Sequence, residues 1–169
     1  MNSSINHARI VALIWGIADD VLRDLYVRGK YRDVILPFTV LRRLDSVLEP
    51  TRDAVIEMKK TLDDAGIANQ DGPLRSAAQQ DFYNTSGFTL RDLRSTANLT
   101  RLRQNFEAYL DGFSPNVQEI IDNFEFRNQL SRLTKADALG SLIEKFLQPD
   151  LDLSPSGLDN HGMGTVFEE

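Results

Sequence analysis

A chain of 169 residues is long enough to bury the core of one compact domain, and a content of 41% hydrophobic and 26% charged residues is typical of globular proteins. The absence of cysteine excludes disulfides, thiolate metal sites and cysteine nucleophiles, and the net charge of −6 argues against a generic nucleic-acid-binding protein. No apolar run approaches the ~20 residues that a membrane span needs, so we expect a soluble, cytoplasmic protein with no membrane partner.

The spacing of the apolar residues predicts an all-α protein. Apolar positions recur at helical intervals almost throughout, and no segment alternates convincingly with a period of two residues. The first predicted helix carries Ile10, Ile14 and Ile17 on one stripe, and Gly29 interrupts the pattern. This pattern favours a compact multi-helix domain.

Residues 31–48 form the most apolar of the predicted helices. Val34 and Phe38 begin one apolar face, and further apolar residues widen it toward the whole circumference. We expect this nearly all-apolar helix to be central, because a helix that is apolar all round is normally buried in a core. Pro37 lacks a backbone N–H, which predicts a kink or a helix start close to Asp33.

Further helices are predicted by periodicity and by capping residues. Gly66 to Pro73 reads as a loop that contains the turn-forming run Asp71-Gly72-Pro73. The predicted helices are Pro50 to about Ala65, Leu74–Tyr83, Leu90–Arg94 with Thr89 as its cap, a helix capped by Asn98 and closed by Gly112, a helix opened by Ser114-Pro115, and Asp137–Gln148.

The end of the chain differs in character from the rest. Asp150–Asp159 reads as an extended connector, and Val166 and Phe167 look like the first apolar residues of a new helix. We therefore divide the chain into a domain over residues 1–149 and a connector with the start of a following helix over residues 150–169. This pattern favours a fragment of a longer protein.

Few residues suggest catalysis. Gly162-Met163-Gly164 is too short for a dinucleotide-binding loop, and His7 and His161 lie near opposite ends of the chain without metal-ligand spacing. The adjacent pairs Asp19-Asp20 and Asp63-Asp64 would point about 100° apart on a helix. We therefore predict no catalytic residue, no cofactor site and no metal site in this chain.

Basic residues are the only residues in the sequence that suggest a binding site. Residues 1–105 carry 15 Lys and Arg against 13 Asp and Glu, whereas residues 106–169 carry 4 against 12. Fourteen of the 19 basic residues are arginine, which favours bidentate contact with phosphate or carboxylate. The alternative is that the arginines pair with local acids such as Asp24, Asp45 and Asp92. The two clusters are Arg28, Lys30, Arg32, Arg42 and Arg43, and then Arg91, Arg94, Arg101 and Arg103.

An ordered set of segments resembles a known family. Together they are similar to the N-terminal helical domain of the methyltransferase (modification) subunit of type I restriction–modification systems, and they span essentially the whole chain. The segments are Ile14–Arg23, Tyr31–Thr51, Asp81–Ser86, Tyr109–Val117 and Asn160–Glu169.

The resemblance implies a parent enzyme that transfers a methyl group from S-adenosylmethionine to the N6 of adenine in DNA. In that family two methyltransferase subunits act with one specificity subunit, and restriction subunits can join them. The methyl-donor site and the Asn/Asp-Pro-Pro-Phe/Tyr motif lie in a following domain, and all six prolines of this chain are isolated. The resemblance thus implies a non-catalytic domain that helps to enclose DNA and contacts the DNA backbone. Both basic clusters are candidates for these contacts. The alternative is a helical protein–protein interaction module without direct DNA contact.

Overall fold

The structure is a computed structural model that describes residues 3–96 and 98–168, apart from the side chains of residues 3–6, 99 and 165–168. In these residues the chain forms helices and no β-strand, and one isolated antiparallel bridge joins Asn84 and Phe113. The predicted all-α class is confirmed. None of the helices in this part of the chain has the length and apolar character of a membrane span.

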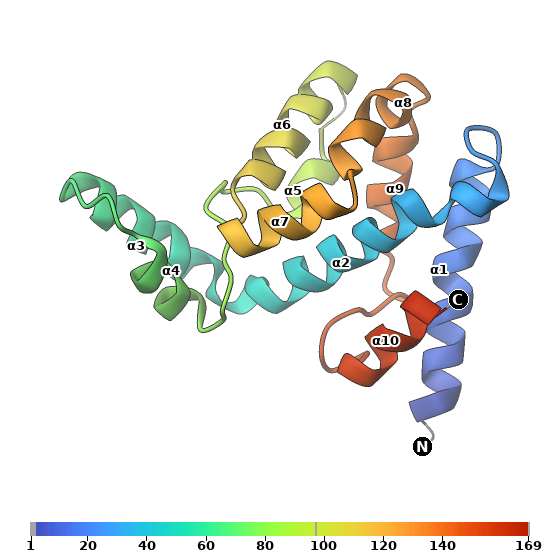
Figure 1. The fold of residues 1–169 in the computed structure, drawn as a ribbon, viewed down its shortest axis with the longest axis horizontal. Helices are drawn as coiled ribbons and strands as arrows, with labels where there is room; N and C mark the ends of the chain where they lie inside the picture. The colour runs from blue at the N-terminus through green and yellow to red at the C-terminus, as the bar shows by residue number, and fades with distance from the viewer. Residues whose placement is uncertain (1–2, 97, 169) are drawn as a thin grey trace.

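The helices follow one another with short connections (Figure 1). In chain order the elements are α1 (Ser3–Leu22), the 3₁₀ turn η1 (Arg28–Lys30), α2 (Arg32–Leu48), η2 (Glu49–Thr51), α3 (Arg52–Asp64), α4 (Asp71–Ala78), α5 (Leu90–Arg94), α6 (Leu99–Asp111), α7 (Pro115–Asn123), η3 (Phe126–Gln129), α8 (Leu130–Lys135), α9 (Ala138–Phe146) and α10 (Asn160–Glu168).

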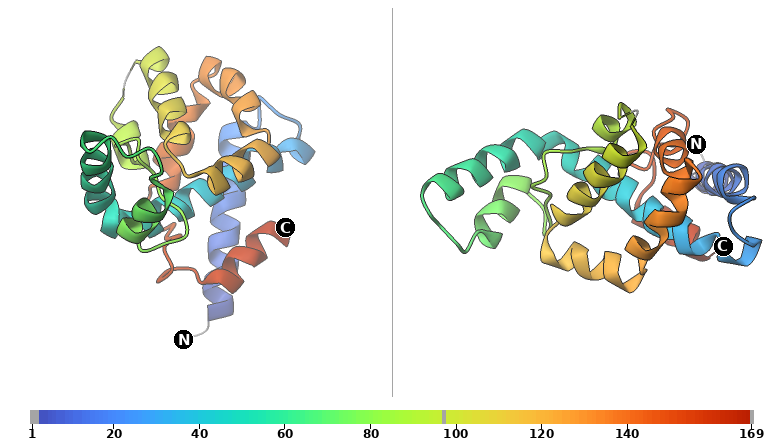
Figure 2. Two further views of the ribbon diagram at one scale, coloured as in Figure 1. Left: turned by 60° about the vertical axis from the view of Figure 1, so that its left-hand side comes forward. Right: turned by 90° about the horizontal axis from the view of Figure 1, so that it is seen from above.

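Four phenylalanines from four elements meet at the centre of the core. Phe38 of α2 lies 5.0 Å from Phe146 of α9, measured between ring centroids. It lies 6.1 Å from Phe106 of α6 and 6.2 Å from Phe126 of η3. All four side chains are fully buried, and rings at these separations gain from edge-to-face and offset contact. Figures 1 and 2 accordingly show α2 running through the middle of the molecule, with the α3–α4 pair at one end and α1 at the other.

Helix α2 is enclosed by apolar packing in its first half only. Every residue from Val34 to Thr39 is buried, and Thr39 donates its hydroxyl hydrogen to the carbonyl of Ile35 at 2.7 Å. The second half buries Arg43 and Asp45 as well as apolar side chains, so the prediction of a nearly all-apolar helix does not extend to it. The helix begins at Arg32, which agrees with the start that Pro37 predicts.

Two of the three predicted N-terminal caps are confirmed. Thr89 and Asp92 form a reciprocal capping box at α5, and the Asn98 side chain accepts the Arg101 N–H at α6. Ser114 precedes α7 but makes no capping hydrogen bond with its side chain. Its hydroxyl donates to Asn116 Oδ1 at 2.6 Å instead, and that oxygen accepts the Val117 N–H.

Helix α4 begins earlier than predicted. Asp71-Gly72-Pro73 lies in its first turn rather than in a loop, because the N–H groups of a first turn have no intrahelical acceptor and proline loses nothing there. The helix also ends earlier than Tyr83, since Gln79 adopts a left-handed backbone with φ of 57°.

Residues 150–168 pack against the rest of the domain. Leu151, Leu153 and Leu158 of the connector are buried in the common core, and α10 lies against α1. The two helices approach closely at Gly162, because a Cβ there would lie 2.8 Å from the Nε2 atom of His7 and would displace that ring. Residues 160–168 form the helix predicted near the end of the chain, whereas the side chains of Val166 and Phe167 and all of Glu169 lie outside the described part.

Candidate functional site

The structure separates the nine predicted basic residues into three groups. Arg42 and Arg43 point into the interior from α2. Arg28, Lys30 and Arg32 lie at the connection between α1 and α2, and Arg91, Arg94, Arg101 and Arg103 lie on α5 and α6. Each group has a different environment, and this environment decides what the group can bind.

Arg43 is a structural residue. Its side chain is buried, with 9% of the residue exposed, and its guanidinium donates to the carbonyl oxygens of Leu153 (3.0 Å) and Leu158. A further hydrogen bond of 3.0 Å reaches Oδ1 of Asn160. Burial lowers the pKa of Arg43, and the nearby carboxylates of Asp159 and Asp152 offset part of that effect. These contacts tie α2 to the connector, so the guanidinium is not available to DNA.

The guanidinium of Arg42 is also engaged by contacts within the domain. Its Nε donates to the carbonyl oxygen of Phe146 at 3.2 Å, and its guanidinium forms an ion pair of 3.5 Å with Asp45. Asp45 also accepts hydrogen bonds from the Leu90 N–H at 3.2 Å and from the Tyr109 hydroxyl at 3.1 Å. Burial raises the pKa of Asp45, although these donors and Arg42 work in the opposite direction. Asp45 thus pairs with a neighbouring arginine, as the alternative interpretation of the sequence predicts. We therefore remove Arg42 and Arg43 from the candidate DNA contacts.

The α5–α6 group has the opposite environment. Arg91, Arg94 and Arg101 are exposed and form no ion pair with any described residue. Arg103 is 41% exposed at its side chain and pairs with Glu107 at 2.9 Å. The nearest acid within α5, Asp92, is engaged by Arg52 at 3.3 Å and by the helix cap. This corner of the molecule therefore presents positive charge to solvent.

Two further basic residues extend this surface. Arg132 and Lys135 are exposed on α8, which packs against α6, and neither forms an ion pair with the described residues. The Arg132 guanidinium is engaged with Tyr26, because it lies 4.8 Å from the centroid of that ring. Figures 1 and 2 show the start of α6 and the end of α8 at the same edge of the molecule. Sequence reasoning missed both residues because they lie in the acidic half of the chain. Their spacing of three, which places side chains on one helix face, was the available signal.

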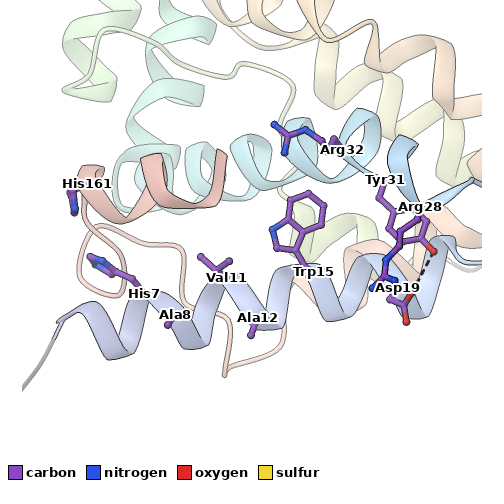
Figure 3. Close-up of a pocket in the computed structure, with 10 residues that line it drawn as sticks. All are labelled: His7, Ala8, Val11, Ala12, Trp15, Asp19, Arg28, Tyr31, Arg32 and His161. Atoms are coloured by element: carbon purple, nitrogen blue, oxygen red, sulfur yellow. Dashed lines mark hydrogen bonds between the residues drawn. The ribbon is translucent and has the colours of Figure 1, made fainter. Parts of the chain in front are cut away.

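The α1–α2 group borders a cavity of about 680 Å³ (Figure 3). Helix α1 forms its floor, the start of α2 and η1 form one end, and α10 forms the other. The lining residues are His7, Ala8, Val11, Ala12, Trp15, Asp19, Arg28, Tyr31, Arg32 and His161. Lys30 is exposed beside this cavity on η1 but does not line it.

The fold brings the two histidines together. Their ring centroids are 6.1 Å apart, and the Nε2 atom of His7 lies 3.5 Å from Oδ1 of Asp159. Gly162 donates its N–H to the same carboxylate at 2.8 Å, and this bond lowers the pKa of Asp159. No group of three or more metal-ligating side chains occurs among the described residues.

One comparison with known proteins finds a match. A model of the family described as the HsdM N-terminal domain matches residues 10–146. No curated protein matches this chain, and no solved structure does. The matched range runs from Ile10 in α1 to the last residue of α9, and so includes all four phenylalanines of the central cluster.

Proposed function

The chain belongs to the family of the HsdM N-terminal domain, from the methyltransferase subunit of type I restriction–modification systems, and on this premise we propose that it contacts the DNA backbone through α5, α6 and α8. The domain would hold DNA without reading its sequence and without supplying a catalytic residue. Reading of the target would fall to the specificity subunit.

The observation that carries this proposal is the cluster of exposed arginines in a protein of net charge −6. Arg91, Arg94 and Arg101 have no ionic partner among the described residues, and Arg132 and Lys135 lie on the helix packed beside them. Arginine binds phosphate oxygens through two parallel hydrogen bonds, which suits contact with a backbone. Contacts of this kind fix position and orientation on a duplex and carry no sequence information.

The parent subunit would transfer a methyl group from S-adenosylmethionine to adenine N6 after the base is extruded from the stacked duplex. The residues of this domain do not fit that cofactor. Gly162-Met163-Gly164 lies inside α10, and no strand precedes a glycine-rich turn in the part of the chain that the structure describes. We therefore assign no step of methyl transfer to this domain. The expected setting is a cytoplasmic complex with a second methyltransferase subunit, a specificity subunit and restriction subunits.

The test compares two charge-reversed forms of the full complex. The first carries Arg91→Glu, Arg94→Glu and Arg101→Glu. The control carries Arg23→Glu, Lys60→Glu and Lys145→Glu, three exposed residues outside α5, α6 and α8, so both forms change net charge equally. We expect DNA affinity to fall at least tenfold further in the first form, measured by fluorescence anisotropy. Equal affinities in the two forms would contradict the proposal.

A second candidate function is a protein-interaction module whose basic residues contact other subunits only. The apolar cavity on α1 favours this reading, because exposed apolar surface with a polar rim is typical of interaction sites. Binding of the chain to DNA at low salt, with the specificity subunit as the competing partner, separates the two. Binding to the specificity subunit without binding to DNA would support the second candidate.

A further inference from the structure

Helix α5 carries a single carboxylate on its outer side, between two arginines. Leu90 and Leu93 are buried in the core, where α5 packs against α6 and α9. Arg91, Asp92 and Arg94 are left outside and are exposed. A helix of five residues is about 7.5 Å long at about 1.5 Å per residue, so these three charges lie within one Debye length of about 10 Å. The Asp92 carboxylate therefore weakens the field of both arginines unless a further cation compensates it.

Arg52, the first residue of α3, supplies this cation from a position 40 residues before Asp92. Its Nη2 atom lies 3.3 Å from the Oδ2 atom of Asp92 and also donates to the carbonyl oxygen of Gly87. The same Oδ2 atom accepts the Thr89 N–H at 3.0 Å, which closes the capping box of α5. A longer contact of 4.0 Å joins Arg52 to Asp53, whose side chain is fully exposed. Two donors thus hold one oxygen of Asp92 toward the start of α5.

Helix α2 fixes the same end of α5 from the inside. The buried carboxylate of Asp45 accepts the Leu90 N–H at 3.2 Å, and its other donor there is the Tyr109 hydroxyl of α6 at 3.1 Å. A helix as short as α5 is not stable in isolation, because one hydrogen-bonded turn does not offset the entropy lost in forming it. The placement of α5 beside α6 therefore depends on the contacts that α2 and α3 make at its start.

The stability of the fold does not account for the pair of Arg52 and Asp92. Their side chains are 36% and 49% exposed, and ion pairs at such exposure contribute little. The Nε atom of Arg52 is enclosed and has no hydrogen-bond partner in the part of the chain that the structure describes, which costs stability. The clear effect of the pair is electrostatic. With Asp92 neutralised by Arg52, the charges of Arg91 and Arg94 are presented to solvent in full.

We infer that Arg52 is a positioning residue for the DNA surface on α5, α6 and α8. Its guanidinium neutralises the Asp92 carboxylate and holds it at the start of α5, so that Arg91 and Arg94 meet a phosphate without a competing acid beside them. Arg52 acts through Asp92 and does not itself contact DNA. This inference rests on the proposed contact with the DNA backbone, and it adds a residue that belongs to neither basic cluster of the sequence.

A double-mutant cycle in the full complex tests the inference, with the affinity for duplex DNA measured by fluorescence anisotropy. Arg52→Met removes the cation, and Asp92→Asn removes the carboxylate charge but keeps an oxygen that can accept the Thr89 N–H. We expect Arg52→Met alone to lower affinity about fivefold, because the released carboxylate can turn toward Arg91 or Arg94. Asp92→Asn should then raise affinity about fivefold in the Arg52→Met background and less than about twofold in the unmodified complex. Arg52→Lys, which keeps a cation beside Asp92, should bind within about twofold of the unmodified complex.

Arg75 and Asp71 of α4 form a matched control pair. Their ion pair of 2.9 Å joins side chains that are 39% and 44% exposed, and it lies outside α5, α6 and α8. Arg75→Met and Asp71→Asn change the net charge as the test variants do. These controls, alone and combined, should each keep DNA affinity within about twofold of the unmodified complex. Circular dichroism should show unchanged helicity in every variant.

Two results would overturn the inference. The first is that Arg52→Met binds DNA as tightly as the unmodified complex. The second is that Asp92→Asn has the same effect in both backgrounds, since Arg52 would then act independently of Asp92. Reversal of Arg91, Arg94 and Arg101 to glutamate separates this failure from failure of the proposed function. If that reversal weakens binding while the cycle is additive, only the role of Arg52 is wrong, and if it has no effect, both proposals are wrong.

Discussion

Arg43 of α2 donates a hydrogen bond of 3.0 Å to the carbonyl oxygen of Leu153, which lies 110 residues further along the chain. With its contacts to Leu158 and Asn160, this guanidinium joins the central helix to the connector and to the first residue of α10. An arginine suits this position because its rigid fork can satisfy several acceptors at once. A charge that looks like a ligand-binding group in the sequence thus serves to hold the end of the domain in place.

Replacement of Arg43 by methionine should destabilise the domain by about 2–4 kcal/mol, because two buried carbonyl oxygens lose their donor while the packing volume is largely kept. Urea unfolding measures this change. Arg23→Met, at an exposed position, is the control and should stay within about 0.5 kcal/mol of the unmodified chain. Equal midpoints for the two variants would show that the Arg43 contacts add no stability.

Replacement of Asp45 by alanine should cost about 3–5 kcal/mol, because it leaves the buried Arg42 guanidinium without its counter-ion and removes the acceptor of two donors. Asp45→Asn keeps an oxygen for the Leu90 N–H and the Tyr109 hydroxyl, so its cost should be clearly smaller. Thermal or urea unfolding of the two variants tests the difference. If Asp45→Asn is destabilised as much as Asp45→Ala, the hydrogen bonds that this oxygen accepts contribute no stability.

Titration of the Tyr83 hydroxyl should contribute to a loss of stability in alkaline solution. Burial, and the hydrogen bond of 3.0 Å that its hydroxyl donates to Asp71, raise the pKa of Tyr83 to about 12 from an ordinary value of 10.0. Between these two values the unfolded chain loses this proton and the folded chain keeps it, so the free energy of unfolding decreases as pH rises. Below pH 10 the contribution is fully present.

The measurement is a set of urea unfolding curves across that pH window for the unmodified chain and for Tyr83→Phe. The variant should lose stability less steeply with pH, since the residue that titrates has been removed. Tyr109 and Tyr26, whose pKa values are also raised by burial, account for the slope that remains. A variant slope as steep as the original would contradict the assignment.

The helices could be predicted because their signals are local. Apolar spacing, the Thr89 capping box and the Asn98 cap are each contained within a few residues, so periodicity and capping rules find them. The same reasoning failed at Asp71-Gly72-Pro73, where residues typical of a turn also fit the first turn of a helix. Local chemistry alone does not distinguish these two uses.

The environment of the basic residues could not be predicted, because it depends on partners distant in sequence. Arg42 reaches the carbonyl of Phe146, 104 residues away, and nothing near it in the sequence indicates this. His7 and His161 likewise meet only because α10 folds back onto α1. The role of Arg91, Arg94 and Arg101 as DNA contacts remains a prediction. It is supported by the exposure of their side chains and by the absence of ion pairs with described residues.

The most direct test of the central claim is the salt dependence of DNA binding by the full complex. Each lost phosphate contact removes about 0.9 from the slope of log affinity against log salt. If Arg91, Arg94 and Arg101 each contact a phosphate, their reversal to glutamate should make the slope shallower by about 2–3, while the Arg23, Lys60 and Lys145 control keeps the original slope. An unchanged slope in the α5–α6 form would contradict the claim that these helices contact the DNA backbone.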